Sequence, residues 1–176
     1  MKWFTRDREY EYVEGEPDPT HEAYRAHIAE LRPLLPEGLK RLAEGGGNLS
    51  LHDGSFIRAS KDPENVETVV VDIRCWDMPE GRLVNNVWIY PALHVRIVYY
   101  QATLVQQDHP EWPAFGDNRL AYPEILDGEL DRCGDNRFVH RMLLWPESAG
   151  FISVEFATAE LVAVRFSGAH AEVLET

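Results

Sequence analysis

Four side chains of this sequence are the candidates for chemistry: His52, Asp53, Glu124 and His140. A histidine next to a carboxylate can serve as a general base or as a metal ligand. A carboxyl group among apolar neighbours, as the sequence around Glu124 suggests, suits acid chemistry. If the fold brings the four together, they form a catalytic site of the hydrolase or metal-dependent type.

Each candidate also has a structural interpretation. In a strand, His52 and Asp53 would point to opposite faces and would converge only with a bend at Gly54. In the structural interpretation Asp53 caps the turn into Ser55 and His52 packs on a strand end. Glu124 would pair with an arginine at a strand end. His140 would be a core histidine whose ring bonds to a backbone group.

Familiar catalytic and metal-binding motifs are missing from the sequence. It holds no HExxH, no HxH, no GxSxG and no phosphate-binding glycine loop, and Cys75 and Cys133 are its only cysteines. A set made of His52, His94, Glu124 and His140 would suit zinc or iron only if the fold joined them. We therefore predict no cofactor and no metal, and favour a protein that is not an enzyme.

The elements that position these residues change in type along the chain. Apolar residues recur with helical spacing at Tyr24, Ile28, Leu31 and Leu35, after a helix-start signal at Asp18 to Thr20. A second short helix is expected before the glycine triplet at 45–47. The helical part thus covers residues of about 19–44.

Beyond the glycines the apolar period becomes two, the spacing of a β-strand. Val69, Val71, Ile73 and Cys75 alternate with polar residues, and similar segments recur up to the C-terminal part. The β-sheet part thus covers residues of about 48–168, with a packed loop at 108–118. We expect one α+β domain over 1–176, its helices on one face of a meandering antiparallel sheet of about six to eight strands.

The charge balance narrows the choice of partners. The 17 basic and 30 acidic residues give a net charge of −13. A field of that sign repels nucleic acid and anionic membranes and suits a basic protein partner. The start of the sequence has no signal-like apolar region and no apolar run nears 18 residues, so we expect a cytoplasmic protein with two free thiols.

Three short motifs resemble those of a known family. They are Met1-Lys2-Trp3-Phe4-Thr5, Leu51-His52-Asp53 and Tyr122-Pro123-Glu124-Ile125. In this order they resemble a family of uncharacterised bacterial proteins, a domain of unknown function, with an M-K-[YW]-F-T start, an L-H-D motif and a Y-x-E-I motif. The resemblance implies a helical segment followed by a β-meander. It implies nothing about activity, because the family is uncharacterised. A looser likeness, in size, charge and architecture alone, is to acidic bacterial immunity proteins.

The sequence favours a binding protein, immunity-like or with another protein partner, ahead of one that binds a small molecule. The alternative is a hydrolase or metal-dependent enzyme that uses the His/Asp/Glu cluster. A homodimer through an uncovered sheet face, or through the edge near Pro91, is a further expectation.

Overall fold

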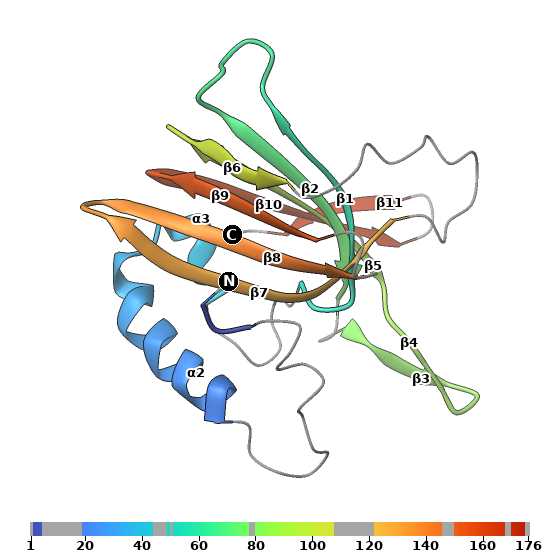
Figure 1. The fold of residues 1–176 in the computed structure, drawn as a ribbon. Coiled ribbons are helices and arrows are strands. Elements are labelled where there is room, and N and C mark those ends of the chain that lie inside the picture. The colour runs from blue at the N-terminus through green and yellow to red at the C-terminus, as the bar shows by residue number, and fades with distance from the viewer. Residues whose placement is uncertain are drawn as a thin grey trace.

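A computed structural model describes residues 2–4, 19–43, 49, 51–77, 80–107, 122–145, 150–167 and 170–174 of the chain. The helices come first: α2 (Pro19–Leu31), the 3₁₀ helix η1 (Arg32–Leu34) and α3 (Glu37–Lys40). Strands follow from Gly54 onward. An N-terminal helix ahead of a mostly antiparallel sheet is the architecture that the sequence predicted in outline (Figure 1).

The strands form one large sheet and one small one. The large sheet has the order β11-β10-β5-β2-β1-β7-β8-β9-β6, and β3 and β4 pair only with each other. The strands are β1 (Gly54–Lys61), β2 (Val69–Trp76), β3 (Arg82–Val84), β4 (Val87–Ile89), β5 (Ala92–Tyr100), β6 (Thr103–Gln107), β7 (Glu124–Gly134), β8 (Arg137–Trp145), β9 (Phe151–Phe156), β10 (Thr158–Ser167) and β11 (His170–Leu174).

The large sheet curls back on itself. Strands β5 and β6 lie far apart in the sheet order, yet only Gln101 and Ala102 separate them in sequence. In the same way Ala157 alone separates β9 from β10, and its N–H donates to the carbonyl of Tyr100. Because β5 pairs with β10 while β6 pairs with β9, the chain joins the two ends of the sheet.

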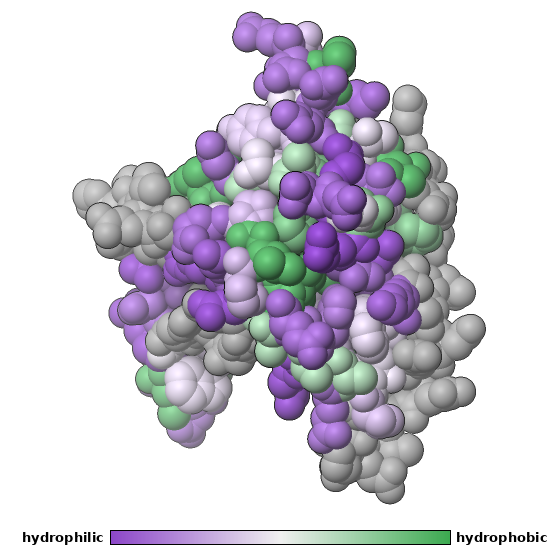
Figure 2. Space-filling view, turned by 90° about the vertical axis from the view of Figure 1, so that its left-hand side faces the viewer, coloured by the Kyte–Doolittle hydropathy of each residue, from purple (hydrophilic) through white to green (hydrophobic). Residues whose placement is uncertain are grey.

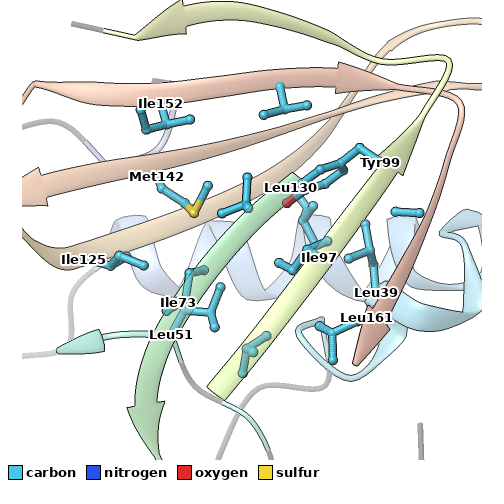
Figure 3. Packing of buried hydrophobic residues seen from close by; sticks show 14 of the residues in the cluster. Leu39, Leu51, Ile73, Ile97, Tyr99, Ile125, Leu130, Met142, Ile152 and Leu161 are labelled. Atoms are coloured by element: carbon cyan, nitrogen blue, oxygen red, sulfur yellow. The ribbon is translucent and has the colours of Figure 1, made fainter. Parts of the chain in front are cut away.

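The hydrophobic core lies inside this curl (Figure 3). Inward-facing residues from neighbouring strands meet in cross-strand rows, such as Ile73 with Val95 and His140 with Val154. The residues that alternate along β2 are fully buried, as their period of two predicted. The buried residues labelled in Figure 3 are Leu39, Leu51, Ile73, Ile97, Tyr99, Ile125, Leu130, Met142, Ile152 and Leu161.

The expected strand number was too low, since the large sheet alone has nine strands. Strand β7 has the sequence EILDGELDRCG. Its acidic residues and glycines interrupt the alternation of apolar and polar residues, so the sequence did not predict this strand. The segment 92–105 is two strands, because Gln101 takes a positive φ of 49° and turns the chain between β5 and β6. Strand β11 extends the sheet beyond residue 168.

The helices pack against two different strands. Helix α2 lies along β7, and α3 lies against β10. Gly38 allows the second contact, because a Cβ at this position would lie 2.7 Å from the backbone N of Leu161. The backbone of α3 therefore comes closer to the sheet than any other residue type would permit.

The surface seen in Figure 2 is mostly hydrophilic, with a small group of hydrophobic residues near its centre. Within the described part of the chain, none of the helices has the length and apolar character needed to span a bilayer. Both cysteines are free thiols, as expected, Cys75 buried and Cys133 exposed. The predictions for the glycine triplet at 45–47 and for the loop at 108–118 lie outside the described residues.

Candidate functional site

The Leu51-His52-Asp53-Gly54 segment is a tight turn that starts β1. The N–H of Gly54 donates to the carbonyl of Leu51 at 2.9 Å, and Asp53 has a φ of 58°. A Cβ on Gly54 would lie 2.7 Å from that same carbonyl oxygen, so the turn requires glycine there. The turn is tied to β7, because the N–H of Asp53 donates to the carbonyl of Ile125 at 2.9 Å.

Strand β7 continues past this turn without β1 beside it, because β1 begins at Gly54 and runs antiparallel toward the start of β7. Their register holds only two pairs, Gly54 with Ile125 and Ser55 with Glu124. Further along β7, side chains replace the missing strand partner: the His52 ring bonds to the carbonyl of Leu126, and the Tyr24 hydroxyl accepts the N–H of Leu130 at 2.8 Å. Burial raises the pKa of Tyr24, so this hydroxyl keeps its proton and can donate it in turn.

A pocket of about 290 Å³ lies here, between α2, the turn before β1 and β7. Its walls are mixed: apolar side chains make up the larger part, and six of the lining residues are polar or titratable. The described residues that line it are Phe4, His21, Tyr24, Arg25, Ile28, Leu42, Ala43, Leu49, Leu51, His52, Asp127, Gly128, Leu130 and His140.

His140 is the most deeply buried polar group of the pocket. Its side chain belongs to β8, is 2% exposed, and has Nδ1 at 2.6 Å from the hydroxyl oxygen of Tyr99 on β5. Gly128 lies between this ring and the pocket, and a Cβ there would sit 3.5 Å from His140 Nε2. The absence of a side chain at Gly128 therefore leaves Nε2 accessible from the pocket.

The burial of the pair keeps both groups uncharged. Burial lowers the pKa of His140 from 6.5 to about 4, so the ring is neutral at neutral pH. Burial also raises the pKa of Tyr99, so its hydroxyl keeps its proton. In the tautomer in which this hydroxyl donates to Nδ1, the ring carries its proton on Nε2, and the pocket then has an N–H donor at its inner end.

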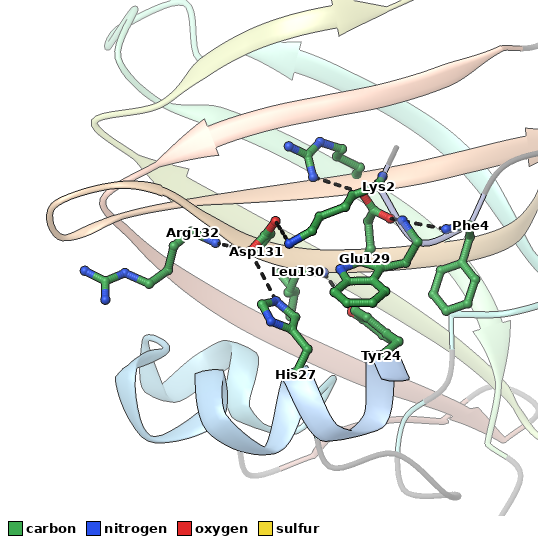
Figure 4. A network of polar contacts seen from close by, with 10 residues as sticks. Lys2, Phe4, Tyr24, His27, Glu129, Leu130, Asp131 and Arg132 are labelled. Carbon is green, nitrogen blue, oxygen red and sulfur yellow. Dashed lines mark hydrogen bonds and ion pairs between the residues drawn. The ribbon is translucent and has the colours of Figure 1, made fainter. Parts of the chain in front are cut away.

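The N-terminal segment forms one wall of the pocket and is held by a buried carboxylate. Glu129 is fully buried and accepts the backbone N–H groups of Lys2 and Trp3, both at 2.8 Å, and of Phe4 at 3.4 Å (Figure 4). Arg141 donates to the same carboxylate at 2.9 Å and balances its charge. The Phe4 ring is thereby placed 4.9 Å from the Tyr24 ring, edge to face.

The structure brings two of the four candidate residues into one site. His52 and His140 both line the pocket, at its exposed and buried ends. Asp53 lies outside the lining, and its carboxylate is 3.5 Å from His52 Nε2. The two side chains approach each other because they sit in a turn and not in a strand, which is the bend at Gly54 that their convergence requires.

Glu124 lies apart from the pocket, at the start of β7 between Ser55 and Trp145 of the neighbouring strands. Its side chain is exposed, so the apolar setting expected from its sequence neighbours is not found. His140 faces the core as expected, but its ring bonds to the Tyr99 hydroxyl and not to a backbone group.

His94, the remaining member of the predicted metal set, belongs to a different cluster. Its Nε2 lies 3.5 Å from Asp72, which also binds Arg58 and Arg96, each at 2.7 Å. Burial by itself would raise the pKa of Asp72. The hydrogen bonds from both arginines outweigh this effect and lower the pKa below its ordinary value. Within the described ranges, no three His, Cys, Asp or Glu side chains are placed to hold a metal ion.

Sequence reasoning missed Tyr99, Gly128 and Glu129. Tyr99 falls on the alternate positions of β5 that face the core, so the alternation of this strand could have predicted a buried hydroxyl group. Glu129 and Gly128 carry no such signal, because the strand that contains them was not recognised. Their roles depend on contacts with residues far away in sequence.

Comparisons of the chain with protein-family models, with curated proteins and with solved structures gave no match. The class of the protein therefore follows from its own geometry: a curled antiparallel sheet with an N-terminal helix and a small pocket where β7 extends past β1. The resemblance to the bacterial family with the M-K-[YW]-F-T start stays a prediction.

Proposed function

We propose that this chain is a non-enzymatic binding protein of the α+β class that holds a small, uncharged molecule in the pocket between α2 and β7. The observation that supports this proposal is the buried His140 ring, whose Nε2 faces a pocket lined in its larger part by apolar side chains. A buried donor is costly unless it is paired, so an occupant with an oxygen acceptor gains a hydrogen bond there.

The shape and charge of the pocket define the ligand class. A volume of about 290 Å³ suits a molecule smaller than most drugs. Arg25 and Asp127 contribute one charge of each sign to the lining, so no net charge is favoured in the ligand. A carbonyl compound with an apolar body, its oxygen toward His140 and Tyr24, fits these constraints.

Binding is favoured over the alternative of a hydrolase. A general base needs a free acceptor nitrogen and a pKa near the working pH. His140 has neither, since Nδ1 is occupied by Tyr99 and its pKa is about 4. The described residues that line the pocket also include no Ser, Thr or Cys nucleophile. The basic protein partner and the cytoplasmic location, which charge and composition favour, stay predictions.

Two probes of equal shape test the proposal. Cyclohexanone and methylenecyclohexane differ in a C=O against a C=CH₂ group. We expect cyclohexanone, at millimolar concentrations, to shift the backbone amide NMR signals of Gly128 and Leu130 in a saturable way. Methylenecyclohexane should bind about fivefold more weakly, since it lacks one hydrogen bond worth roughly 1 kcal/mol.

A matched pair of variants locates the binding. In Gly128→Ala the new methyl group makes only ordinary contacts, at 3.5 Å from His140 Nε2, but it covers the donor. We expect this variant to keep its melting temperature and lose the preference for cyclohexanone. Gly134→Ala, whose Cβ would lie 4.0 Å from the nearest atom, should bind as the wild type does. Equal affinity of the two probes, or no saturable shift with either, would overturn the proposal.

A further inference from the structure

The hairpin of β3 and β4, which we name the arm (Arg82–Ile89), is a second feature that calls for a partner. Its two strands form a sheet of their own and project from the body of the molecule (Figure 1). Asn85 and Asn86 both have positive φ, 50° and 64°, which is typical of a tight two-residue hairpin turn. An isolated two-stranded hairpin is marginally stable in water.

The arm is apolar on both of its faces. Opposite residues of the two strands share a face: Leu83 with Trp88 on one side, and Val84 with Val87 on the other. These four side chains are 39–62% exposed, and Ile89 is 44% exposed. Such a concentration of exposed apolar side chains on one short element marks an interaction site.

The base of the arm is held on the sheet. The N–H of Asp77 donates to the carbonyl of Pro91 at 3.0 Å, which closes the base. Arg165 of β10 binds Asp77 at 2.5 Å and reaches Glu80 at 3.8 Å. These contacts tie the residues on either side of the arm to the large sheet.

A surface that matches the arm lies next to its base on the same chain. Trp76, Ala92 and Phe166 form a cross-strand row over β2, β5 and β10, and Val162 follows on β10. Trp76, Phe166 and Val162 are 42%, 44% and 40% exposed. We name Trp76, Val162 and Phe166 the shelf. The row between them on this face holds Arg74, His94 and Val164, and the Arg74 guanidinium lies over the Trp76 ring. The shelf is therefore apolar at its three named side chains, with polar groups between them.

We infer that two copies of this chain form a two-fold dimer in which the arm of each copy lies on the shelf of the other. Two-fold symmetry makes both contacts at once, because each copy supplies one arm and one shelf. An arm that lies on a shelf buries one of its faces, and the face with Leu83 and Trp88, each more than half exposed, offers on the order of 250 Å². Two such faces and the shelves that cover them bury about 1,000 Å², the lower limit for a specific interface.

Charge does not oppose this contact. The chain has a net charge of −13, but the arm has no acidic residue, and its one charged residue is Arg82. Repulsion between the copies comes from more distant acidic residues and is screened over about 8 Å at physiological salt. The dimer should therefore become tighter as salt is added, opposite to a contact that depends on charge attraction.

Sedimentation of the full chain tests the inference. We expect a dimer at micromolar concentration that dissociates on dilution and is tighter in added salt. Val87→Lys, on the arm, should raise the dimer Kd by at least about 30-fold. Val66→Lys is the matched control, because Val66 is 71% exposed and lies far from the arm in the turn before β2. It should leave the Kd unchanged, and both variants should keep the melting temperature that the wild type has at concentrations where it is monomeric.

Mixing two defective variants tests the exchange itself. Phe166→Lys damages the shelf and Val87→Lys damages the arm, so each alone should be monomeric. In a mixed dimer the intact arm of one copy meets the intact shelf of the other, and dimers should reappear. A monomeric wild type, an unaffected Val87→Lys dimer or the absence of mixed dimers would each overturn the inference.

Discussion

The hydroxyl oxygen of Tyr99 lies 2.6 Å from Nδ1 of His140, and both side chains are buried inside the curled sheet. The two residues come from β5 and β8, which are not neighbours in the sheet, so their bond crosses the core. It holds the His140 ring with Nε2 toward the pocket.

Removal of the Tyr99 hydroxyl should destabilise the fold. Tyr99→Phe leaves Nδ1 of His140 buried without its partner, and we expect the free energy of unfolding to fall by about 1–3 kcal/mol. Tyr100→Phe is the control, because the Tyr100 hydroxyl donates to Glu160 on the exposed side of the sheet at 3.0 Å. It should cost less than about 0.5 kcal/mol. Urea unfolding measures both, and equal losses would contradict a special role for the core pair.

Acid should weaken the fold through His140. Above pH 6.5 the ring is neutral in both states, and below it the unfolded chain binds a proton that the folded chain, with a pKa of about 4, does not. Stability should therefore fall as pH drops from 6.5 to 4, by roughly 3 kcal/mol for this group. In the double variant Tyr99→Phe, His140→Leu this part of the pH dependence should be absent. Urea unfolding across this range, wild type against double variant, checks it.

The buried carboxylate of Glu129 should be needed to hold the N-terminal segment. In Glu129→Gln one acceptor oxygen becomes an NH₂ group that faces the N–H donors of Lys2 and Trp3. We expect a loss of about 2–4 kcal/mol and faster hydrogen exchange at residues 2–4. Glu160→Gln, at an exposed site, should change neither. Unaltered exchange in Glu129→Gln would show that the segment is held by its ring contacts alone.

Gly38 should not tolerate a side chain. In Gly38→Ala the methyl group would lie 2.7 Å from the Leu161 N and 3.1 Å from the Glu160 Cα, so α3 must move away from β10. We expect a loss of about 1–3 kcal/mol, although alanine has the higher helix propensity by up to about 1 kcal/mol. Gly134→Ala, with no close neighbour, should stay within about 1 kcal/mol of the wild type. A stabilised Gly38→Ala would refute the close approach.

Part of the fold could be read from the sequence because local pattern and burial agree. The helical spacing of Ile28 and Leu31 and the alternation of Val69 to Cys75 each place apolar residues on one side of an element. His140 falls on the same alternating positions of its strand as the apolar residues Phe138 and Met142, and this pattern predicted its burial for the same reason. The candidate site was found only in part: His52 and His140 share the pocket, whereas Glu124 lies outside it.

The sequence by itself determined the order of the elements, the inward faces of the clear strands and the acidic charge, because these depend on neighbours along the chain. Only the tertiary structure decided that β7 extends beyond the start of β1, that Tyr99 reaches His140, and that Glu129 holds the N-terminal segment. Each of these contacts joins residues far apart in sequence. No local period encodes them, since they arise only when the sheet curls and brings its distant strands together.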